Sequence, residues 1–591
     1  MFRQSVRFFK EKFQSAGATF GLVLVLCSLG VGCRSGFIVQ PLSGCKSGES
    51  GCQPSPVPAS SLNAQPVAIN SGQSSILSWS SRNGTTVDIQ PGIGHVQAMG
   101  SVRISPKQTT TYTLTVTGSG GTSKTSATVN VGSTTQPAGV HLSPGDDIQA
   151  AVKSNPTGTT FILAPGVYRM QSVVPKEGDV FSGQTGATLV GAALISPSSW
   201  KQASSSVWVA QATGITAEPS YGGVCDSSHP ACKYPEDLFF DSKPLTRVAS
   251  LSLVAPGKWY LDYSTEKAYV GSDPAGHTVE ISVARAAFWG SASNVTIKGL
   301  AIEKYASLAG KGAINAMAAL NGYGPVGTGW VVESDDVYLN HGLGVRASDG
   351  MTVRNNKIHD NGQMGVAGSG SNILVQGNDI YKNNYAGYAY DWEAGGAKIG
   401  MYSTHVTFDN NYVHDNKGPG LHGDIGDSYF VFENNHTARN IGSGIHYEIS
   451  YHAVIRNNLI EDDGYSPDGT GFWYGGGILV SNSSDVEVYG NTVRDCMNGI
   501  GGTQADRGVD SKTGLPYTLK NLYVHNNTIT QQTGFAAGIV KSSKLDNSVF
   551  TSWNNRFINN TYHLGSKAGK FFEWLNSPQT LAAWQKRDGN N

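Results

Sequence analysis

The stretch that decides the fold is a tandem repeat in the middle of the chain. Residues 405–428 read HVTFDNNYVHDNKGPGLHGDIGDS, and residues 429–452 read YFVFENNHTARNIGSGIHYEISYH. Both 24-residue units hold short apolar runs, an Asn-Asn pair and a Gly-apolar-His step at matching offsets. A fixed period of this length indicates stacked repeat units, each of which packs only against its neighbours.

The same frame extends to both sides of this repeat. If the second Asn of each pair marks one turn of the chain, successive markers lie 22 to 36 residues apart. The markers are Asn356, Asn378, Asn411, Asn435, Asn458, Asn491, Asn527 and, with a poorer match, Asn555. Three short strands per period, without a helix pattern, predict an all-β protein whose residues 138–590 form a parallel β-helix. Stacked coils would join the marker amides in a hydrogen-bonded ladder, to which we assign a structural role.

A second register points to function. A strand follows each variable loop, and it begins with glycine, an apolar residue and a third residue that alternation directs out of the coil. These outward residues form one column, namely Arg346, Lys398, His422 and His446. Two positions further on, Asp424 and Glu448 share the same face. Because neighbouring coils lie about 4.8 Å apart, the column predicts a concentrated ionisable patch.

The patch admits two catalytic interpretations. In a glycoside hydrolase, one carboxyl protonates the leaving oxygen while a second acts as nucleophile or activates water. In a lyase, cations or Ca²⁺ neutralise a uronate while a Lys, His or Arg removes its C5 proton, and Asp424 and Glu448 would bind the calcium. The candidate catalytic residues are Asp424, Glu448, His422, His446, Lys398 and Glu393.

Each candidate also has a structural interpretation. Asp424 and Glu448 could simply be neutralised by Lys398 and the two histidines. Stacking two carboxylates without a proton or cation between them is costly, and proteins retain such pairs where shifted pKa values are used. We therefore favour the functional interpretation. A surface glycan-binding or adhesive protein remains the non-enzymatic alternative.

Aromatic residues in the loops favour a sugar as the ligand. One aromatic-rich loop, residues 385–393, enters the strand of Lys398, and Phe472-Trp473-Tyr474 enters the strand that follows His446. Aromatic rings beside a polar cleft are suited to stacking on sugar rings. The candidate substrate-binding residues are Arg346, Asp391, Trp392, Trp473 and Tyr474.

The start of the repeat region resembles a known superfamily. A short amphipathic helix at residues 146–152 and a strand within residues 160–168 resemble the N-terminal cap of the pectate lyase-like, right-handed β-helix proteins. That resemblance covers roughly residues 138–590 and implies a carbohydrate-active protein with its cleft on the outward face of the sheet after the variable loops. The motifs of polygalacturonases and pectate lyases are not matched, so hydrolysis and β-elimination both stay open.

The N-terminal segment indicates export from a bacterial cell. Residues 1–33 read as a basic and then apolar signal peptide, and Leu29-Gly30-Val31-Gly32-Cys33 resembles the lipobox of bacterial lipoproteins, with Cys33 as the acylated residue. Ordinary cleavage near Gly32 is the alternative. We expect a secreted or surface-bound protein, attached to the outer membrane if it is lipidated.

The cysteine spacing agrees with an oxidising compartment. Cys45 and Cys52 enclose six residues, and so do Cys225 and Cys232. Both spacings suit small-loop disulfides, so we expect one bond between Cys45 and Cys52 and another between Cys225 and Cys232. Cys496 suits a buried core thiol.

The remaining segments divide the chain into modules. Residues 34–64 read as a linker, and residues 65–132 predict a small β-sandwich that resembles bacterial immunoglobulin-like modules, with Trp79 in its core. Residues 197–286 break the coil period and predict an inserted β-rich subdomain. A net charge of −1 argues against nucleic acid as the partner. We expect a monomer whose partner is a polysaccharide.

Overall fold

The computed structural model describes residues 57–70, 74–132, 138–215, 217, 222–390, 392–465, 473, 475–566 and 568–587. The chain divides into two compact units, Met1–Ala138 and Gly139–Asn591. In the described part of the chain, no helix is both long and apolar enough to cross a membrane.

Some predicted features lie outside the described residues. They are the signal peptide with Cys33, the two cysteines Cys45 and Cys52, and the candidate binding residues Asp391 and Tyr474. The disulfide expected between Cys45 and Cys52 therefore stays a prediction, whereas the bond expected between Cys225 and Cys232 is present.

The first unit consists of two β-sheets around one apolar core. One sheet contains β1 (Ala59–Gln65), β3 (Ser75–Arg82) and β6 (Met99–Ile104). The other contains β2 (Ala68–Asn70), β8 (Gly121–Gly132), β7 (Thr110–Gly118), β4 (Thr86–Gln90) and β5 (Gly94–His95). Trp79 lies in this core. Because β1 begins at Ala59, the last residues of the predicted linker belong to the unit.

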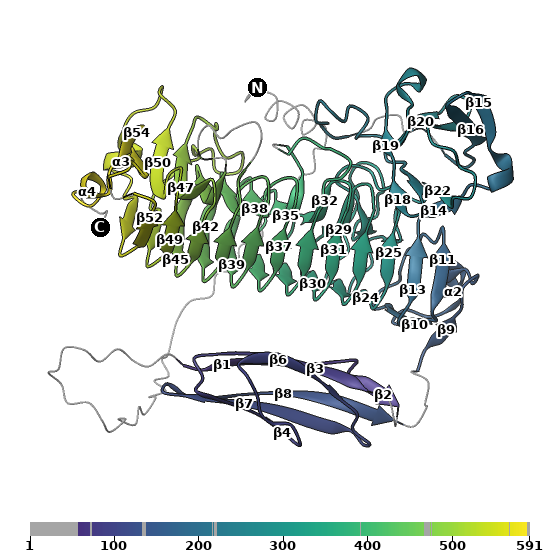
Figure 1. Ribbon diagram of the computed structural model, residues 1–591, viewed down its shortest axis with the longest axis horizontal. Helices are drawn as coiled ribbons and strands as arrows, with labels where there is room; N and C mark the ends of the chain where they lie inside the picture. Colours follow the sequence, from purple (N-terminus) through teal and green to yellow (C-terminus); the bar gives the residue numbers. More distant parts are fainter. Residues whose placement is uncertain are drawn as a thin grey trace, which may run out of the picture. The chain divides into compact units, whose positions relative to one another are not determined.

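The second unit is a parallel β-helix of three sheets, in which each coil contributes one strand to sheet 1, then sheet 2, then sheet 3 (Figure 1). Sheet 1 contains β23 (Phe288–Trp289), β26 (Gly312–Asn315), β29 (Leu343–Ala347), β32 (Met364–Gly368), β35 (Gly395–Gly400), β38 (Leu421–Asp424), β41 (Ile445–Glu448), β44 (Gly476–Ser481), β47 (Asn498–Gln504), β50 (Ala537–Lys541), β53 (Phe572–Trp574) and β54 (Ser577–Gln579).

Sheets 2 and 3 complete each coil. Sheet 2 contains β9 (Val140–Leu142), β10 (Thr160–Leu163), β12 (Val180–Gly183), β24 (Thr296–Lys298), β27 (Val331–Glu333), β30 (Thr352–Arg354), β33 (Leu374–Gln376), β36 (Thr407–Asp409), β39 (Ser428–Glu433), β42 (Tyr451–Arg456), β45 (Ser484–Tyr489), β48 (Tyr523–His525) and β51 (Arg556–Ile558). Sheet 3 contains β11 (Gly166–Arg169), β13 (Ala187–Val190), β25 (Ala301–Glu303), β28 (Asp336–Tyr338), β31 (Lys357–His359), β34 (Asp379–Tyr381), β37 (Tyr412–His414), β40 (His436–Ala438), β43 (Leu459–Glu461), β46 (Thr492–Arg494), β49 (Thr528–Gln531) and β52 (Thr561–Leu564).

The Asn-Asn pairs lie at the turn from sheet 2 to sheet 3, and the two members have different roles. The first Asn of the pair 434/435 has a left-handed backbone with φ 57°, a conformation that Asn tolerates better than most residues. Glycine takes this place at Gly377 and Gly490, where φ is 65° and 64°. The second Asn is buried and points along the stack.

The buried amides form the predicted ladder. Asn411 Nδ2 donates to Asn435 Oδ1 at 2.9 Å, and Asn435 Nδ2 donates to Asn458 Oδ1 at 3.0 Å. Each Oδ1 also accepts the backbone N–H of the preceding Asn, so the ladder satisfies backbone groups at a buried turn. Asn555 is not part of it, because Asn527 bonds to Asn560, which occupies the equivalent turn one coil further on.

A second ladder runs parallel to the first at the turn that leaves sheet 3. Its members lie five residues after those of the first ladder, and each bonds to the next. They are Asn340, Asn361, Asn383, Asn416, Asn440 and Asp463. Cys496, which is five residues after Asn491, takes the following place as a buried free thiol. The two ladders together fix the register of every coil that carries a candidate residue.

Caps close the two ends of the β-helix. Helix α2 (Ile148–Ser154) begins at Asp147, whose side chain accepts the N–H of Ala150 at 3.0 Å, and it buries Ile148 and Val152. At the other end, helix α4 (Leu581–Trp584) buries Trp584 and is preceded by the short helix α3 (Ser548–Thr551). The N-cap of α4 is Thr580, which directly follows β54 and whose side chain accepts the N–H of Ala583.

The inserted subdomain has two sheets between coils of the β-helix, which are antiparallel except for the parallel pairing of β19 with β20. They contain β14 (Ala192–Leu194), β22 (Val279–Ser282), β17 (Leu238–Phe240) and β18 (Lys243–Pro244), and β15 (Lys201–Ser204), β16 (Val207–Gln211), β21 (Lys267–Val270), β20 (Lys258–Asp262) and β19 (Thr246–Arg247). Short 3-10 turns occupy Pro197–Ser199 and Leu251–Leu253. Cys225 and Cys232 form their disulfide beside this subdomain. His341 at the turn before β29 bonds to Asp237 at 2.9 Å and ties the subdomain to the coils.

We expect Asn435→Ala to destabilise the β-helix by about 2–4 kcal/mol, because the change leaves the Asn411 N–H and the Phe408 carbonyl without their buried partner. Urea denaturation measures the loss, and hydrogen exchange of a peptide that contains Asn411 locates it. The matched control is Asn434→Gly, in the exposed neighbouring position with positive φ. Equal stability of the two variants would contradict the claim that the Asn435 side chain stabilises the β-helix.

Candidate active site

The candidate residues lie on three adjacent strands of sheet 1. Backbone pairing aligns Lys398 of β35 with His422 of β38, and His422 with His446 of β41. Two residues further along the strands, Asp424 pairs in register with Glu448. The apolar residues directly before the two histidines, Leu421 and Ile445, are fully buried inside the coil, as alternation predicts. The side chains of Lys398, His422, His446, Asp424 and Glu448 therefore share the outward face, and we call them the sheet 1 cluster.

The cluster faces away from the coil interior, yet it is covered. Each of its five residues is less than a tenth exposed. Glu393, from the loop that precedes β35, covers Lys398, and Arg507, from the loop that follows β47, covers Glu448. The loop of Arg507 is held in turn by Asp510, which accepts a hydrogen bond from Tyr451 at 3.0 Å. The cluster is therefore buried beneath loop side chains, whereas alternation alone indicates an open surface.

Lys398 is the centre of one charge network. Its Nζ lies 2.8 Å from Asp424 Oδ2 and 3.0 Å from Glu393 Oε1. Burial acts to lower the pKa of Lys398, but the charges of Asp424 and Glu393 outweigh it and raise the pKa well above its ordinary value. Lys398 therefore stays cationic and is unsuited to act as a base. The lyase interpretation must assign proton abstraction to a histidine.

Glu448 is the centre of the second network. Arg507 Nη1 pairs with its Oε1, and His422 Nε2 and His446 Nε2 lie 3.5 and 3.9 Å from its Oε2. Burial acts to raise the pKa of Glu448, but the charge of Arg507, the largest opposing cause, holds it well below its ordinary value. Glu448 is consequently a carboxylate at neutral pH. A general acid in a glycoside hydrolase requires the opposite shift.

The two histidines stack on each other. Their ring centroids lie 4.5 Å apart with an interplanar angle of 9°. Burial lowers the pKa of His446 to about 3, although the charge of Glu448 acts in the other direction. His446 is therefore neutral at physiological pH, and its Nε2 also lies 3.1 Å from Ser481 Oγ of β44.

Two buried polar atoms of the cluster have no hydrogen-bond partner among the described residues. They are His422 Nε2 and Asp424 Oδ1, both on β38. The 3.5 Å contact of His422 Nε2 with Glu448 does not meet hydrogen-bond geometry. Unpaired buried polar atoms are costly, and two of them on one face point to a ligand that completes them.

The cluster fits a metal ion poorly. His422, His446 and Glu448 bring one donor atom each within 4.8 Å of one another. An imidazole nitrogen binds a metal in the plane of its ring, and two nearly parallel stacked rings cannot both direct a lone pair at one ion. Calcium, which we expected at Asp424 and Glu448, prefers oxygen ligands. Each of these carboxylates is already paired with a side-chain cation.

The other predicted residues lie apart from the cluster. Arg346 of β29 shares the column, but Ala367 of β32 separates it from Lys398, and its guanidinium donates to Gly310 O at 3.1 Å. Trp392 packs with Tyr388 near the Cys225–Cys232 disulfide. Trp473 is buried two coils beyond His446, where it lies against Gly501 of β47.

Arg507 is the residue that the sequence did not reveal. It follows β47 in a long loop, and the 36-residue interval between Asn491 and Asn527 is the sequence signal of that loop. The interval shows that residues are inserted but not where they fold. An arginine that is 59 residues from its glutamate carries no spacing signal.

Comparisons with known proteins identify the fold. A family model described as a right handed beta helix region matches residues 327–427 and 424–569. No curated protein matches the chain in sequence. The solved complex of XylC with xylose is 16% identical over 74% of this chain and 81% of that chain, with a TM-score of 0.47.

Two further solved structures are similar to this chain. The A-module of the mannuronan C-5 epimerase AlgE6 of Azotobacter vinelandii is 14% identical over 73% of this chain and 94% of that chain, with a TM-score of 0.39. A glycoside hydrolase is 12% identical over 74% and 96%, with a TM-score of 0.34. We draw neither a substrate nor a reaction from these likenesses.

The neutral state of His446 predicts a pH effect on stability. Between pH 6.5 and about 3 the unfolded chain binds a proton at this imidazole and the folded protein does not, so stability falls as the pH falls. His446→Gln removes this proton linkage. From pH 6.5 to 5, the variant should therefore lose about 2 kcal/mol less stability than the parent, at about 1.4 kcal/mol per pKa unit.

Urea denaturation at the two pH values measures this difference. The range above pH 5 avoids the ordinary titration of glutamate, which would add the Glu448 effect. His452→Gln, at an exposed histidine on β42, is the matched control and should follow the parent. If His446→Gln also follows the parent, His446 is not held neutral.

Proposed function

Because this chain contains a right-handed parallel β-helix, and because its sheet 1 cluster pairs both carboxylates with cations beside two histidines, we propose that it is a polysaccharide-modifying enzyme that acts by β-elimination. The observation that supports this choice is the pairing of Asp424 with Lys398 and of Glu448 with Arg507. Each pair sets a cation against a buried carboxylate.

Hydrolysis is the less suitable reaction for this geometry. A glycoside hydrolase needs one carboxyl group that holds a proton at neutral pH, and enzymes obtain it by raising the pKa. The pKa of Glu448 is lowered instead. Asp424 lies 2.8 Å from a lysine whose own pKa is raised by that contact. Glu448 is therefore not prepared to protonate a leaving oxygen, and Asp424 is held in an ion pair with Lys398.

Elimination from a uronate uses Lys398 as a cation and Glu448 as a carboxylate, the charge states that these groups already have. Two N–H donors of Lys398 bond to Asp424 and Glu393, and the third is available for the carboxylate of a uronate. Glu393 lies on a loop with its side chain about one third exposed, so a substrate carboxylate can replace it. Binding there would stabilise the charge that develops next to C5.

His422 is the proposed base. Its Nε2 accepts the C5 proton, the C–H electron pair forms the C4–C5 double bond, and the C4–O bond breaks with its electrons on the leaving oxygen. The imidazolium of His422 then returns its proton to that oxygen. Neutral His446 stacks on His422 and fixes the ring plane, while Glu448 stabilises the imidazolium as its charge forms.

The two buried atoms without a hydrogen-bond partner in the described ranges, His422 Nε2 and Asp424 Oδ1, favour an enzyme over a glycan-binding or adhesive protein. An adhesive surface has no need of a buried histidine nitrogen and a buried carboxylate oxygen without partners, whereas a reacting site does. For this reason we favour the enzyme. We also propose that the protein is exported and acts on an extracellular polysaccharide, on the strength of residues 1–33, with a lipid anchor at Cys33 as one form of attachment.

We expect His422→Gln to lower the turnover rate about 10²–10⁴-fold, the usual contribution of a general base. The assay is a panel of uronate-containing polysaccharides, with ultraviolet absorbance for unsaturated ends and reducing-sugar release measured in parallel. His452→Gln again serves as the control, because this histidine is exposed on sheet 2 and stacks on Tyr429.

Two outcomes would oppose the proposal. Release of reducing ends without the absorbance would mean that the protein hydrolyses its substrate. Parental activity of His422→Gln on a substrate that the parent cleaves would remove the sheet 1 cluster from the reaction. Circular dichroism and the melting temperature establish that each variant is folded.

A further inference from the structure

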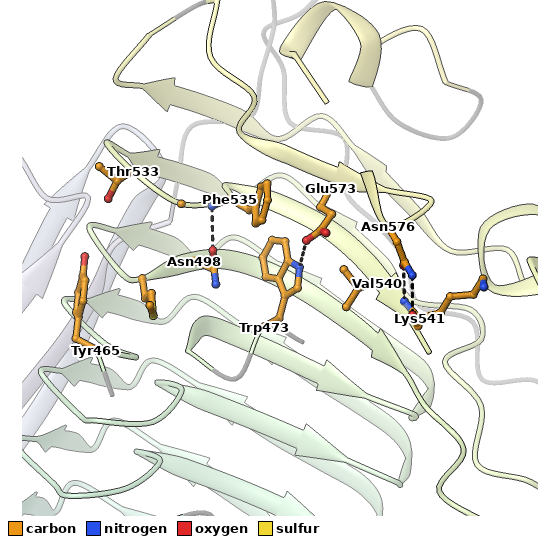
Figure 2. Close-up of a pocket in the computed structure, with 11 residues that line it drawn as sticks. Tyr465, Trp473, Asn498, Thr533, Phe535, Val540, Lys541, Glu573 and Asn576 are labelled. Atoms are coloured by element: carbon orange, nitrogen blue, oxygen red, sulfur yellow. Dashed lines mark hydrogen bonds between the residues drawn. The ribbon is translucent and has the colours of Figure 1, made fainter. Parts of the chain in front are cut away.

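A pocket lies on the same outward face of sheet 1, beyond the cluster. The column of the cluster continues through Leu479 of β44 to Gly501 of β47, so the pocket begins about 10 Å, or two strand spacings, from His446. It has a volume of about 560 Å³. The residues that line the pocket include Trp473, Phe535, Lys541 and Glu573 (Figure 2).

The floor of the pocket is a fixed aromatic surface. The ring of Trp473 packs closely against the backbone of β47 at Gly501. A Cβ added to Gly501 would come within 2.1 Å of that ring, so this position requires glycine. Its Nε1–H donates to Glu573 Oε2 at 3.0 Å, and its ring stacks on Phe535 at 5.8 Å and 22°. Trp473 is only 2% exposed, so Phe535, which is partly exposed, presents the accessible ring.

The polar groups of the pocket differ in charge from those of the cluster. Glu573 is half-buried, and burial raises its pKa. Lys541 is the cationic lining residue, but its Nζ donates to the carbonyl of Leu545 at 2.8 Å, and Figure 2 shows its side chain extending away from Trp473. Among the described lining residues, the charged group beside the aromatic surface is thus a carboxyl group.

We propose that this pocket binds an uncharged sugar ring of the substrate chain, two coils from the site that takes a uronate. The C–H face of a pyranose would stack on Phe535, and its hydroxyls would donate to Glu573. A uronate would bring its carboxylate next to Glu573 and is disfavoured by like-charge repulsion. Since this inference rests on the proposed function, the substrate is a heteropolysaccharide in which uronate and neutral units occur along one chain.

The test uses the folded full-length protein with the change His422→Gln, so that no substrate turns over. Saturation-transfer NMR titrations compare a neutral sugar with its uronate and its 2-amino sugar in the gluco, galacto and manno series. Each titration is repeated with Phe535→Ala, and only the binding that this change removes is assigned to the pocket, because uronate bound at Lys398 does not depend on Phe535. In at least one series, the neutral sugar should bind at least 10-fold more tightly than the uronate. Phe535→Ala should weaken that binding at least 10-fold, whereas Phe550→Ala, a partly buried phenylalanine outside the pocket, should leave it unchanged.

Glu573→Gln tests the charge separately and keeps the side-chain size. The variant should still bind the neutral sugar. The affinity of its pocket for the uronate should come to within about 3-fold of its affinity for the neutral sugar. Failure of every neutral sugar to bind, preference for the uronate or the amino sugar in every series, or binding that survives Phe535→Ala would overturn the inference. Because these titrations require no turnover, a failure of the proposed elimination would appear in the activity assay alone.

Discussion

The rest of the structure depends on the hydrogen bond from one buried asparagine amide to the next. Each bond, such as the 2.9 Å contact from Asn411 to Asn435, joins two coils and also satisfies a backbone N–H at a turn that water does not reach. A coil that slipped by one residue would exchange its inner and outer side chains and lose both ladders. The ladders therefore position the sheet 1 cluster, although the first ladder lies at the turn between sheets 2 and 3 and only the second lies at the turn that leads into sheet 1.

Charge compensation is the second constraint. Five ionisable side chains are buried on three adjacent strands, and such burial is tolerated because each carboxylate has its own cation, Lys398 or Arg507. The same pairing decides the chemistry that we favour, since it holds both carboxylates in ion pairs and leaves proton transfer to His422. Structure and proposed function thus follow from one arrangement of charge.

The periodic features could be predicted from the sequence. The Asn-Asn pairs located the turns, and the Gly-apolar-X step placed Lys398, His422 and His446 in one column, because strand alternation and coil period are local rules. The second ladder is also visible in the sequence, since Asn361, Asn383, Asn416 and Asn440 each follow a marker by five residues.

The contacts that the variable loops make with the rest of the protein could not be predicted from the sequence. Arg507 reaches Glu448, Trp392 packs beside a disulfide, and Trp473 lines a separate pocket, because non-periodic loops fold according to contacts that spacing does not encode. The burial of the cluster and the pKa direction of Glu448 follow from those loops. For this reason the sequence left hydrolysis and elimination equally open, and the choice depended on side-chain geometry.

The fate of the C5 hydrogen tests the central claim most directly. A uronate oligosaccharide that carries deuterium at C5 is incubated with the protein in ordinary water, and NMR or mass spectrometry follows the label in the products. Loss of the label to solvent in step with product formation is the predicted result, because elimination must remove that hydrogen. Products that retain the label at C5 would show that the bond was hydrolysed and would contradict the account.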